Sequence, residues 1–199
     1  MTNDQLKALG LGPEWLNPLN ETFDKYQINT PKRQACFLGQ TRHESGNFKF
    51  TRENLNYSAK ALMATWPSRF PNMDIAMQYE RKPEKIANKV YAGRMGNTED
   101  GDAAKYMGRG LIQCTGKEAY QHCGEALGVD LLAHPELLEQ PKYAALSAGW
   151  FWNKKGLNAL ADEGTKDSFD VMTKRINGGL LGLDDRKAKM IEALKILGG

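Results

Sequence analysis

The sequence is poor in residues on which several protein classes depend. Only three of its 199 residues are cysteine, at positions 36, 114 and 123, and they show neither Cys-x-x-Cys pairing nor metal-ligand spacing. An odd, scattered set argues against a disulfide framework and favours folding in a reducing cytoplasm. The three histidines are scattered too, and His43-Glu44 lacks the second histidine that a zinc-protease helix carries. Metalloprotease and amidase chemistry are therefore disfavoured.

Long apolar runs are also missing. No stretch of 18 apolar residues occurs, and the first seven residues are mostly polar. We therefore expect neither a transmembrane span nor a signal peptide. The net charge of +3 is mildly basic, which favours an anionic polymer but falls far short of a nucleic-acid-binding protein. The acidic segment 97–102 lacks the last glutamate of a calcium loop, so we expect a solvated loop, no metal and no cofactor.

Strand patterns are scarce, whereas helical patterns recur along the whole chain. Only 48–53 and 110–114 could pair as a small hairpin. Apolar stripes and capping residues predict helices over 3–9, 17–26, 31–45, 58–65, 73–81, 83–91, a segment after Thr115, 141–151, 167–176 and 184–197. We expect a mainly α fold, or α+β with that hairpin. It would form a single domain over 1–199, with two lobes joined near 92–105 and no separate binding module.

Two glutamates, Glu44 and Glu53, form the most informative pair. Thr30 and Pro31 mark a helix start, and Glu44 falls in the last turn of that helix, on the face that Phe37 predicts to be buried. Burial and the negative end of the helix dipole both disfavour an ionised carboxyl there. Glu44 is therefore predicted to hold a proton and to serve as a general acid.

Glu53 cannot continue the same helix, because nine residues would separate the two acids by about 13 Å and turn them to opposite faces. A break at Gly46 lets the chain fold back. We expect Phe48 and Phe50 to share one side of an extended segment and Glu53 to lie on the other, polar side. That position suits an ionised base. Single acids of this kind are usually solvated surface charges, so the pair needs support from other motifs.

Two later runs supply that support. In the run 106–118, Gly108 and Gly110 permit close backbone approach, and Thr115 with Glu118 fits a helix capping box. In 175–180, Asn177-Gly-Gly is typical of a turn, although its amide could also bind a sugar hydroxyl. A cap and a turn are the ordinary interpretations of both runs.

Taken together and in order, the runs 37–46, 108–113 and 176–179 resemble glycoside hydrolase family 19, the chitinase-like family. The short link between the two glutamates, with the runs 86–91 and 94–97, resembles the phage endolysin branch of that family rather than the plant chitinases. The resemblance covers about residues 30–190. Two departures are Cys114, where an aliphatic residue is more usual, and the absence of plant-type disulfides.

The resemblance implies a lysozyme-like fold with a substrate cleft between two lobes, and an inverting mechanism. Glu44 would be the general acid, Glu53 the general base, and Thr115 would position the attacking water. Inversion requires the two carboxyls to lie about 6.5–9.5 Å apart. Arg186 is placed on the Glu53 side. The residues implied to bind substrate or support the site are Gln113, Asn177, Tyr106 and His43.

The leading functional hypothesis is an endolysin that hydrolyses β-1,4 bonds in peptidoglycan as a muramidase. It would be made in the host cytoplasm and would reach the periplasmic wall through a holin. The alternative is a chitinase acting on N-acetylglucosamine polymers, and a remote alternative is an inactive glycan-binding protein. We expect a polysaccharide partner, no nucleic acid, no stable membrane insertion and a monomer.

Overall fold

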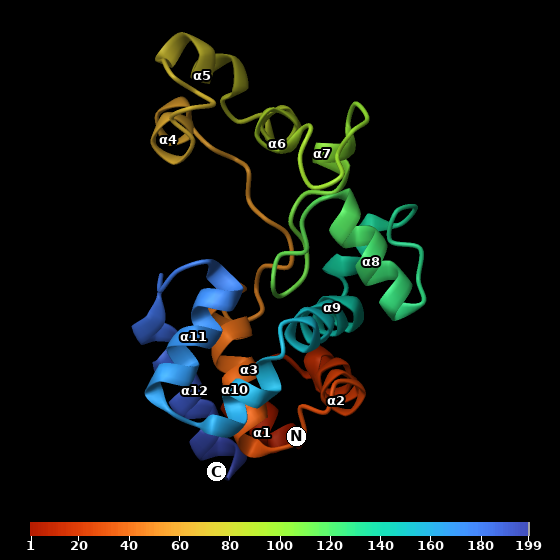
Figure 1. Cartoon of the computed structure of the whole chain (residues 1–199), viewed down its shortest axis with the longest axis vertical. Helices are drawn as coiled ribbons and strands as arrows, with labels where there is room; N and C mark the ends of the chain where they lie inside the picture. Colours follow the sequence, from red (N-terminus) through yellow and green to blue (C-terminus); the bar gives the residue numbers. More distant parts are fainter. Residues whose placement is uncertain (199) are drawn as a thin grey trace. The chain divides into compact units, whose positions relative to one another are not determined.

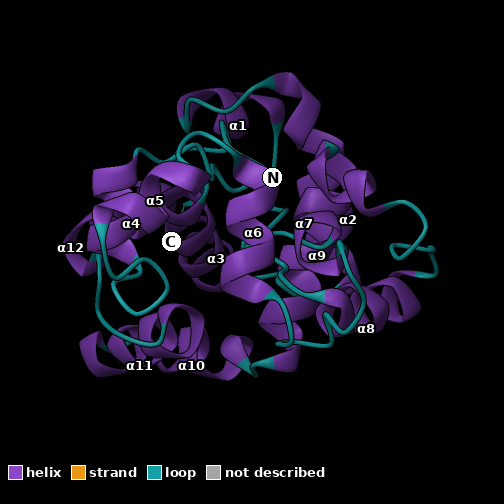
Figure 2. Cartoon of the chain, turned by 90° about the horizontal axis from the view of Figure 1, so that it is seen from above, coloured by secondary structure: helices purple, strands orange, loops and turns teal. Residues whose placement is uncertain are grey.

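The computed structural model describes residues 1–198 and is mainly helical (Figures 1 and 2). Helices of the N-terminal half are α1 (Asn3–Ala8), the 3-10 turn η1 (Pro13–Trp15), α2 (Leu16–Lys25), α3 (Pro31–Glu44), α4 (Ala59–Thr65), α5 (Met73–Tyr79) and α6 (Pro83–Tyr91). Those of the C-terminal half are α7 (Asp102–Lys105), α8 (Lys117–Leu127), η2 (Pro135–Glu139), α9 (Pro141–Lys154), α10 (Leu157–Glu163), α11 (Lys166–Asn177) and α12 (Leu183–Leu197). The mainly α prediction is confirmed. The expected helices are found, whereas α7, α10 and both 3-10 turns were not predicted.

The chain divides into two compact units. The first unit contains Met1–Thr51, Gly110–Gln113 and Glu136–Gly199, and the second contains Arg52–Arg109 and Cys114–Pro135. The predicted seam at 92–105 is therefore wrong, because that segment lies wholly inside the second unit. The chain changes unit after Thr51, Arg109, Gln113 and Pro135.

Helix α3 lies at the centre of the first unit, with α12 packed along it. Its start is as predicted: the Thr30 hydroxyl accepts a hydrogen bond from the Arg33 backbone, and Pro31 occupies the first turn. Gly39 makes the packing possible. A Cβ at this position would lie 2.7 Å from Cβ of Met190 and 2.9 Å from the carbonyl oxygen of Arg186. Close approach through Gly39 brings the start of α12 beside the end of α3.

The second unit has its own apolar core, contributed mainly by α4, α5 and α6. Leu62, Phe70 and Ile86 are fully buried there. Trp66, which precedes Pro67, packs against the same cluster and so serves the core. This core fixes α6, and the last residue of α6 takes part in the candidate site.

The chain between α3 and Glu53 corrects the expected alternation of Phe48 and Phe50. Asn47 and Phe48 adopt left-handed backbone conformations, with φ of 57° and 64°, so side chains do not alternate as in a strand. Phe48 is 6% exposed and packs on Trp15, whereas Phe50 is 63% exposed. Over the described residues no strand forms. The expected hairpin is reduced to single bridges from Arg109 to Arg52 and to Cys114. No helix in the described part of the chain has the length and apolar character needed to cross a membrane.

Candidate active site

Glu44 is the last residue of α3, and its carboxylate is held by a buried guanidinium. Nη2 of Arg186 donates to Oε1 of Glu44 at 2.5 Å, and the two side chains are 1% and 21% exposed. Arg186 also donates from Nη1 to Oε1 of Gln40 at 2.7 Å and from Nε to the Leu181 carbonyl at 3.0 Å. All three guanidinium nitrogens are thus engaged, which fixes the position of the Glu44 carboxylate.

This pairing corrects the placement of Arg186 on the Glu53 side. Arg186 binds Glu44 because α12 packs against α3 through Gly39. It also adds a charge-assisted hydrogen bond to Glu44 that the sequence argument lacked.

His43 lies beside Glu44 and is anchored from α12. Its Nδ1 is 2.6 Å from Oδ2 of Asp185, and the Nζ of Lys189 donates to the other Asp185 oxygen at 2.5 Å. These hydrogen bonds, first from Lys189 and then from His43, lower the pKa of the Asp185 carboxyl. Gly182 leaves room for the ring, since a Cβ there would lie 2.2 Å from Cε1 of His43. His43 is therefore positioned by the start of α12.

Glu53 belongs to the second unit, where its carboxylate accepts two hydrogen bonds from uncharged donors. The backbone N–H of Gly108 donates to Oε1 at 2.6 Å, and the hydroxyl of Tyr91 donates to Oε2 at 3.0 Å. The Glu53 backbone N–H donates in turn to the Gly108 carbonyl at 2.9 Å. Each oxygen of the Glu53 carboxylate thus has a hydrogen-bond donor, and the two donors together fix its position.

Tyr91 is suited to this donor role. Burial, followed by the nearby Glu53 charge, raises the pKa of the Tyr91 hydroxyl above its usual range. The hydroxyl therefore keeps its proton near neutral pH and can donate it to Glu53. Sequence reasoning missed this contact, because 38 residues separate Tyr91 from Glu53 and no local spacing signals it.

The segment that presents Gly108 is held by buried polar groups. Nη1 of Arg109 donates to the Lys105 carbonyl at 2.8 Å and to the Tyr120 hydroxyl at 2.9 Å. That hydroxyl donates to the Met107 carbonyl at 2.6 Å. The backbone on both sides of Gly108 is thus fixed, and with it the N–H that binds Glu53.

Of the two roles expected for Tyr106, substrate binding is wrong and support of the site fits, because the structure does not offer its hydroxyl to a sugar. The residue is 3% exposed, its ring packs on Tyr120, and its hydroxyl donates to the Leu132 carbonyl at 3.1 Å. Tyr106 supports the backbone beside Gly108 and is not itself accessible. Its place in a glycine-rich run concealed this burial.

Thr115 is half-buried, and the predicted capping box is wrong. Helix α8 takes Gly116 as its N-cap, with φ of 91° and no side-chain cap. A Cβ at Gly116 would lie 2.4 Å from Cβ of Met95, which explains the glycine. Thr115 is therefore not the residue that caps the helix.

Gln113 and Asn177 are exposed polar residues at turns. Gln113 ends the tight turn 110–113 in the first unit. Asn177 is the last residue of α11, and the left-handed Gly178, with φ of 77°, follows it as the C-cap. Within residues 1–198 the Asn177 side chain makes no hydrogen bond, so its amide is open to solvent.

The acidic loop at 97–102 is more ordered than predicted. Asn97, 2% exposed, donates to the Tyr91 carbonyl at 3.1 Å and accepts from the Lys117 backbone at 3.0 Å. Asp102 accepts from Nζ of Lys117 at 3.0 Å and from the Glu99 backbone at 3.1 Å. Burial opposes ionisation of Asp102, but these hydrogen bonds lower its pKa overall. Through these hydrogen bonds the loop holds the end of α6 close to the start of α8.

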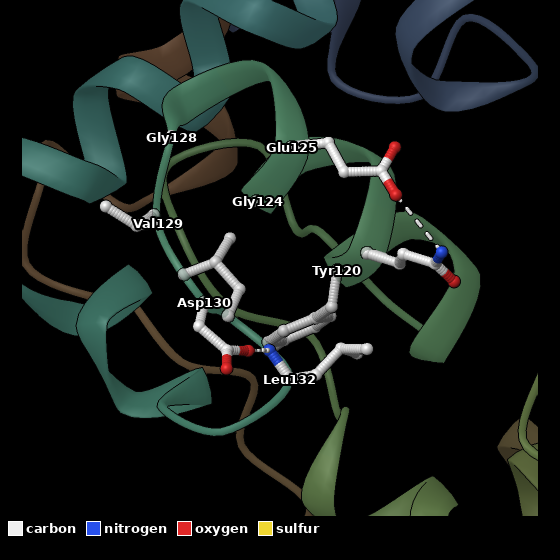
Figure 3. Close-up of a pocket in the computed structure, with 9 residues that line it drawn as sticks. Tyr120, Gly124, Glu125, Gly128, Val129, Asp130 and Leu132 are labelled. Carbon is white, nitrogen blue, oxygen red and sulfur yellow. Dashed lines mark hydrogen bonds between the residues drawn. The ribbon is translucent and has the colours of Figure 1, made fainter.

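A depression of about 440 Å³ lies elsewhere on the second unit, between α8 and the segment that follows it (Figure 3). Its two carboxylates, Glu125 and Asp130, are already engaged. Glu125 accepts from Gln121 at 3.1 Å, and Asp130 accepts from the backbone of Leu132 at 3.1 Å. These acids cap local structure, and neither is a candidate for catalysis. Across residues 1–198, no group of three His, Cys, Asp or Glu side chains could hold a metal ion.

Comparison with known proteins places the chain in a family. Residues 24–159 match the family model for glycoside hydrolase 19, described as chitinase class I. A glycosyl hydrolase family 19 domain-containing protein of Haemophilus influenzae is 44% identical over 167 residues, which cover 82% of this chain and 79% of the relative. An endochitinase of Arabidopsis thaliana is 30% identical over 161 residues, covering 80% of this chain but only 44% of the plant protein.

The fold agrees with this assignment. Chitinase C from Streptomyces griseus superposes with a TM-score of 0.68 at 22% identity, over 99% of this chain and 76% of that structure. The fold is accordingly lysozyme-like and mainly helical, as predicted. The protein is a glycoside hydrolase. More narrowly, the chain belongs to glycoside hydrolase family 19, the chitinase-like family.

Proposed function

We propose that the protein is an endolysin that hydrolyses β-1,4-glycosidic bonds of peptidoglycan as a lysozyme-like muramidase. The observation that carries a glycosidase mechanism is the contrast between its two glutamates. Glu44 is bound by a cation and partly buried, whereas Glu53 is bound by two neutral donors. Two carboxyls in different environments are what an acid and a base require.

In this proposal Glu44 protonates the leaving glycosidic oxygen as the bond from that oxygen to the anomeric carbon breaks. Glu53 removes a proton from water as the water oxygen bonds to the same carbon from the opposite face, with Thr115 orienting the water. Glu44 must carry a proton at that moment. Gln113, Asn177 and His43 are proposed to bind sugar substituents or support the acid.

Turnover of chitin is the main alternative, and two observations favour it. Curated plant relatives are named endochitinases, and the chain has the fold of chitinase C. The chain spans less than half of the Arabidopsis relative, so that protein's activity is a proposal for this chain as well. An inactive glycan-binding protein is a remote third possibility, and the presence of both glutamates counts against it.

The proposed place of action is the periplasmic wall, reached from the cytoplasm of a phage-infected host after holin-mediated release. In the described part of the chain all three cysteines are buried and none forms a disulfide, which suits folding in a reducing compartment. Secretion of the protein in a host without the holin gene would contradict this route. The working unit is proposed to be a monomer, and a sedimentation-velocity measurement tests that.

The function is tested by clearing of outer-membrane-permeabilised Gram-negative cells, with mass spectrometry of the products. Wild-type protein should clear the cells and release muramic acid at new reducing ends, whereas Glu44→Gln and Glu53→Gln should not. Turnover of chitin oligosaccharides without clearing would move the assignment to chitinase. Inactivity on both substrates would favour the third possibility, an inactive glycan-binding protein.

A further inference from the structure

Helix α6 carries a row of lysines on one face. Lys82, Lys85 and Lys89 are spaced by three and then four residues, which places them on the same side of a helix. None of the three is paired with an acid in the described chain. Nζ of Lys82 donates to the Gln78 carbonyl at 2.9 Å, and Lys85 has no hydrogen-bond or ion-pair partner from 1 to 198. These three lysines are called the α6 basic face below.

Lys89 is held in place without its charge being neutralised. Its ammonium lies 5.1 Å from the ring centre of Tyr79 and 5.9 Å from that of Phe70. Contact with two aromatic faces restricts the side chain and leaves the positive charge available to a ligand. A restricted cation loses less entropy on binding than a free one.

Two depressions meet at Lys85. One, of about 410 Å³, is lined by Lys82, Lys85 and Arg52, with Glu84 as its only acid. The other, of about 490 Å³, is lined by Lys85 and Lys89 among others, with Asp100 as its only acid. Cations therefore outnumber acids in both, so the local field attracts an anionic ligand.

The α6 basic face adjoins the proposed catalytic base. Arg52, which lines the first depression, directly precedes Glu53 in the chain. Tyr91, the last residue of α6, donates to the Glu53 carboxylate from the side of the helix that points away from the lysines. Arg52 is therefore the residue that links the α6 basic face to Glu53, and all of these residues belong to the second unit.

We propose that the α6 basic face binds carboxylates carried by the glycan substrate and so selects an anionic glycan over a neutral one. Peptidoglycan bears carboxylates on its lactyl groups and peptide stems, whereas chitin is uncharged. This inference rests on the proposed function, since it names the feature by which peptidoglycan would be preferred. Each exposed contact contributes little, so the preference comes from the row as a whole.

The decisive variant is Lys85→Gln, because Lys85 makes no contact whose loss would disturb the fold. Its matched control is Lys60→Gln, an exposed lysine on α4 of the same unit that lines neither depression. For Lys85→Gln we expect kcat/KM on peptidoglycan sacculi to fall about two- to fivefold at low salt, mainly through KM. Hydrolysis of neutral chitin oligosaccharides should be unchanged, and Lys60→Gln should match wild type on both substrates. The deficit should vanish in about 1 M NaCl, where the screening length is about 3 Å.

A binding measurement separates this inference from the proposed function. Co-sedimentation with sacculi, in a Glu44→Gln background, needs no hydrolysis. Lys85→Gln should weaken binding, and so should sacculi whose carboxylates have been converted to methylamides. If wild type fails to hydrolyse sacculi, the proposed muramidase is wrong, and sedimentation alone then decides the inference. Unchanged sedimentation by Lys85→Gln, equal losses on sacculi and chitin, or undiminished binding to amidated sacculi would each overturn it.

Discussion

The hydroxyl of Tyr91 donates to Oε2 of Glu53 across 3.0 Å, while the backbone of Gly108 donates to Oε1 at 2.6 Å. Each carboxylate oxygen thus has one neutral donor and keeps a second acceptor site. A water could use such a site, and the two donors would hold the carboxylate still while it takes a proton. The relationship gives Tyr91 a positioning role that can be tested apart from its role in packing.

Tyr91→Phe should lower kcat by about tenfold while leaving KM within about twofold, because a hydrogen bond to a charged group is worth roughly 1.5–3 kcal/mol. A positioning role predicts that the loss falls on kcat and not on KM, and that the unfolding free energy changes by less than the activity does. Tyr143→Phe, on α9 of the first unit, is the control. A loss shared by kcat and KM, or one matched by an equal loss of unfolding free energy, would indicate a purely structural role for Tyr91.

Gly39→Ala should disturb the Glu44 carboxylate from a distance. The added Cβ would lie 2.7 Å from Cβ of Met190 and 2.9 Å from the Arg186 carbonyl, so α12 must shift. Overpacking of this kind costs about 1–3 kcal/mol of unfolding free energy. Urea denaturation measures that cost, and kcat should fall with it because Arg186 moves. Gly179→Ala is the matched control, since a Cβ there meets nothing within 4 Å. Equal stability of the two variants would contradict the packing argument.

Arg186→Lys should be poorly tolerated even though it preserves the charge. Arg186 donates to Glu44, Gln40 and the Leu181 carbonyl at once, and a lysine cannot reproduce that planar arrangement. We expect a loss of about 1–3 kcal/mol in unfolding free energy, because buried acceptors are left without donors. Activity should fall further than this stability loss explains. A variant with wild-type activity would show that the Glu44 carboxylate needs no such support.

Local signals in the sequence were sufficient to predict most of the helices, and the catalytic roles of the two glutamates stay a prediction. Thr30, Pro31 and the apolar stripe of α3 are local signals, and local signals decide where a helix begins and ends. The boundaries of α10, Gly156 and Gly164, are equally local signals. Missed elements of this type are short, and short helices carry weak periodicity.

Partners distant in the chain could not be predicted. Arg186 lies 142 residues from Glu44, and Tyr91 lies 38 from Glu53, so only tertiary packing joins them. The Phe48 prediction was wrong for a related reason. Its left-handed backbone is unusual for an aromatic residue and is stabilised by the contact with Trp15, which no local rule anticipates. The burial of Tyr106 likewise depends on Tyr120 and on the Leu132 carbonyl.

Asp102→Asn should reveal how the 97–102 loop stabilises the second unit. Hydrogen bonds from Lys117 and from the Glu99 backbone lower the pKa of Asp102 in the folded protein below its unfolded value of about 3.9. A depressed folded pKa contributes stability that is fully present above the unfolded value and is lost as pH falls through the folded one. The melting temperature of Asp102→Asn should therefore lie below that of wild type at pH 7, and the difference between the two melting temperatures should narrow below about pH 4.

Thermal melts from pH 7 to about pH 3 measure this difference, with Asp74→Asn on α5 as an exposed control. A gap that stays constant across this range would assign the loss to packing instead of charge. Because Asn97 of the same loop donates to the Tyr91 carbonyl, a loosened loop should also lower kcat.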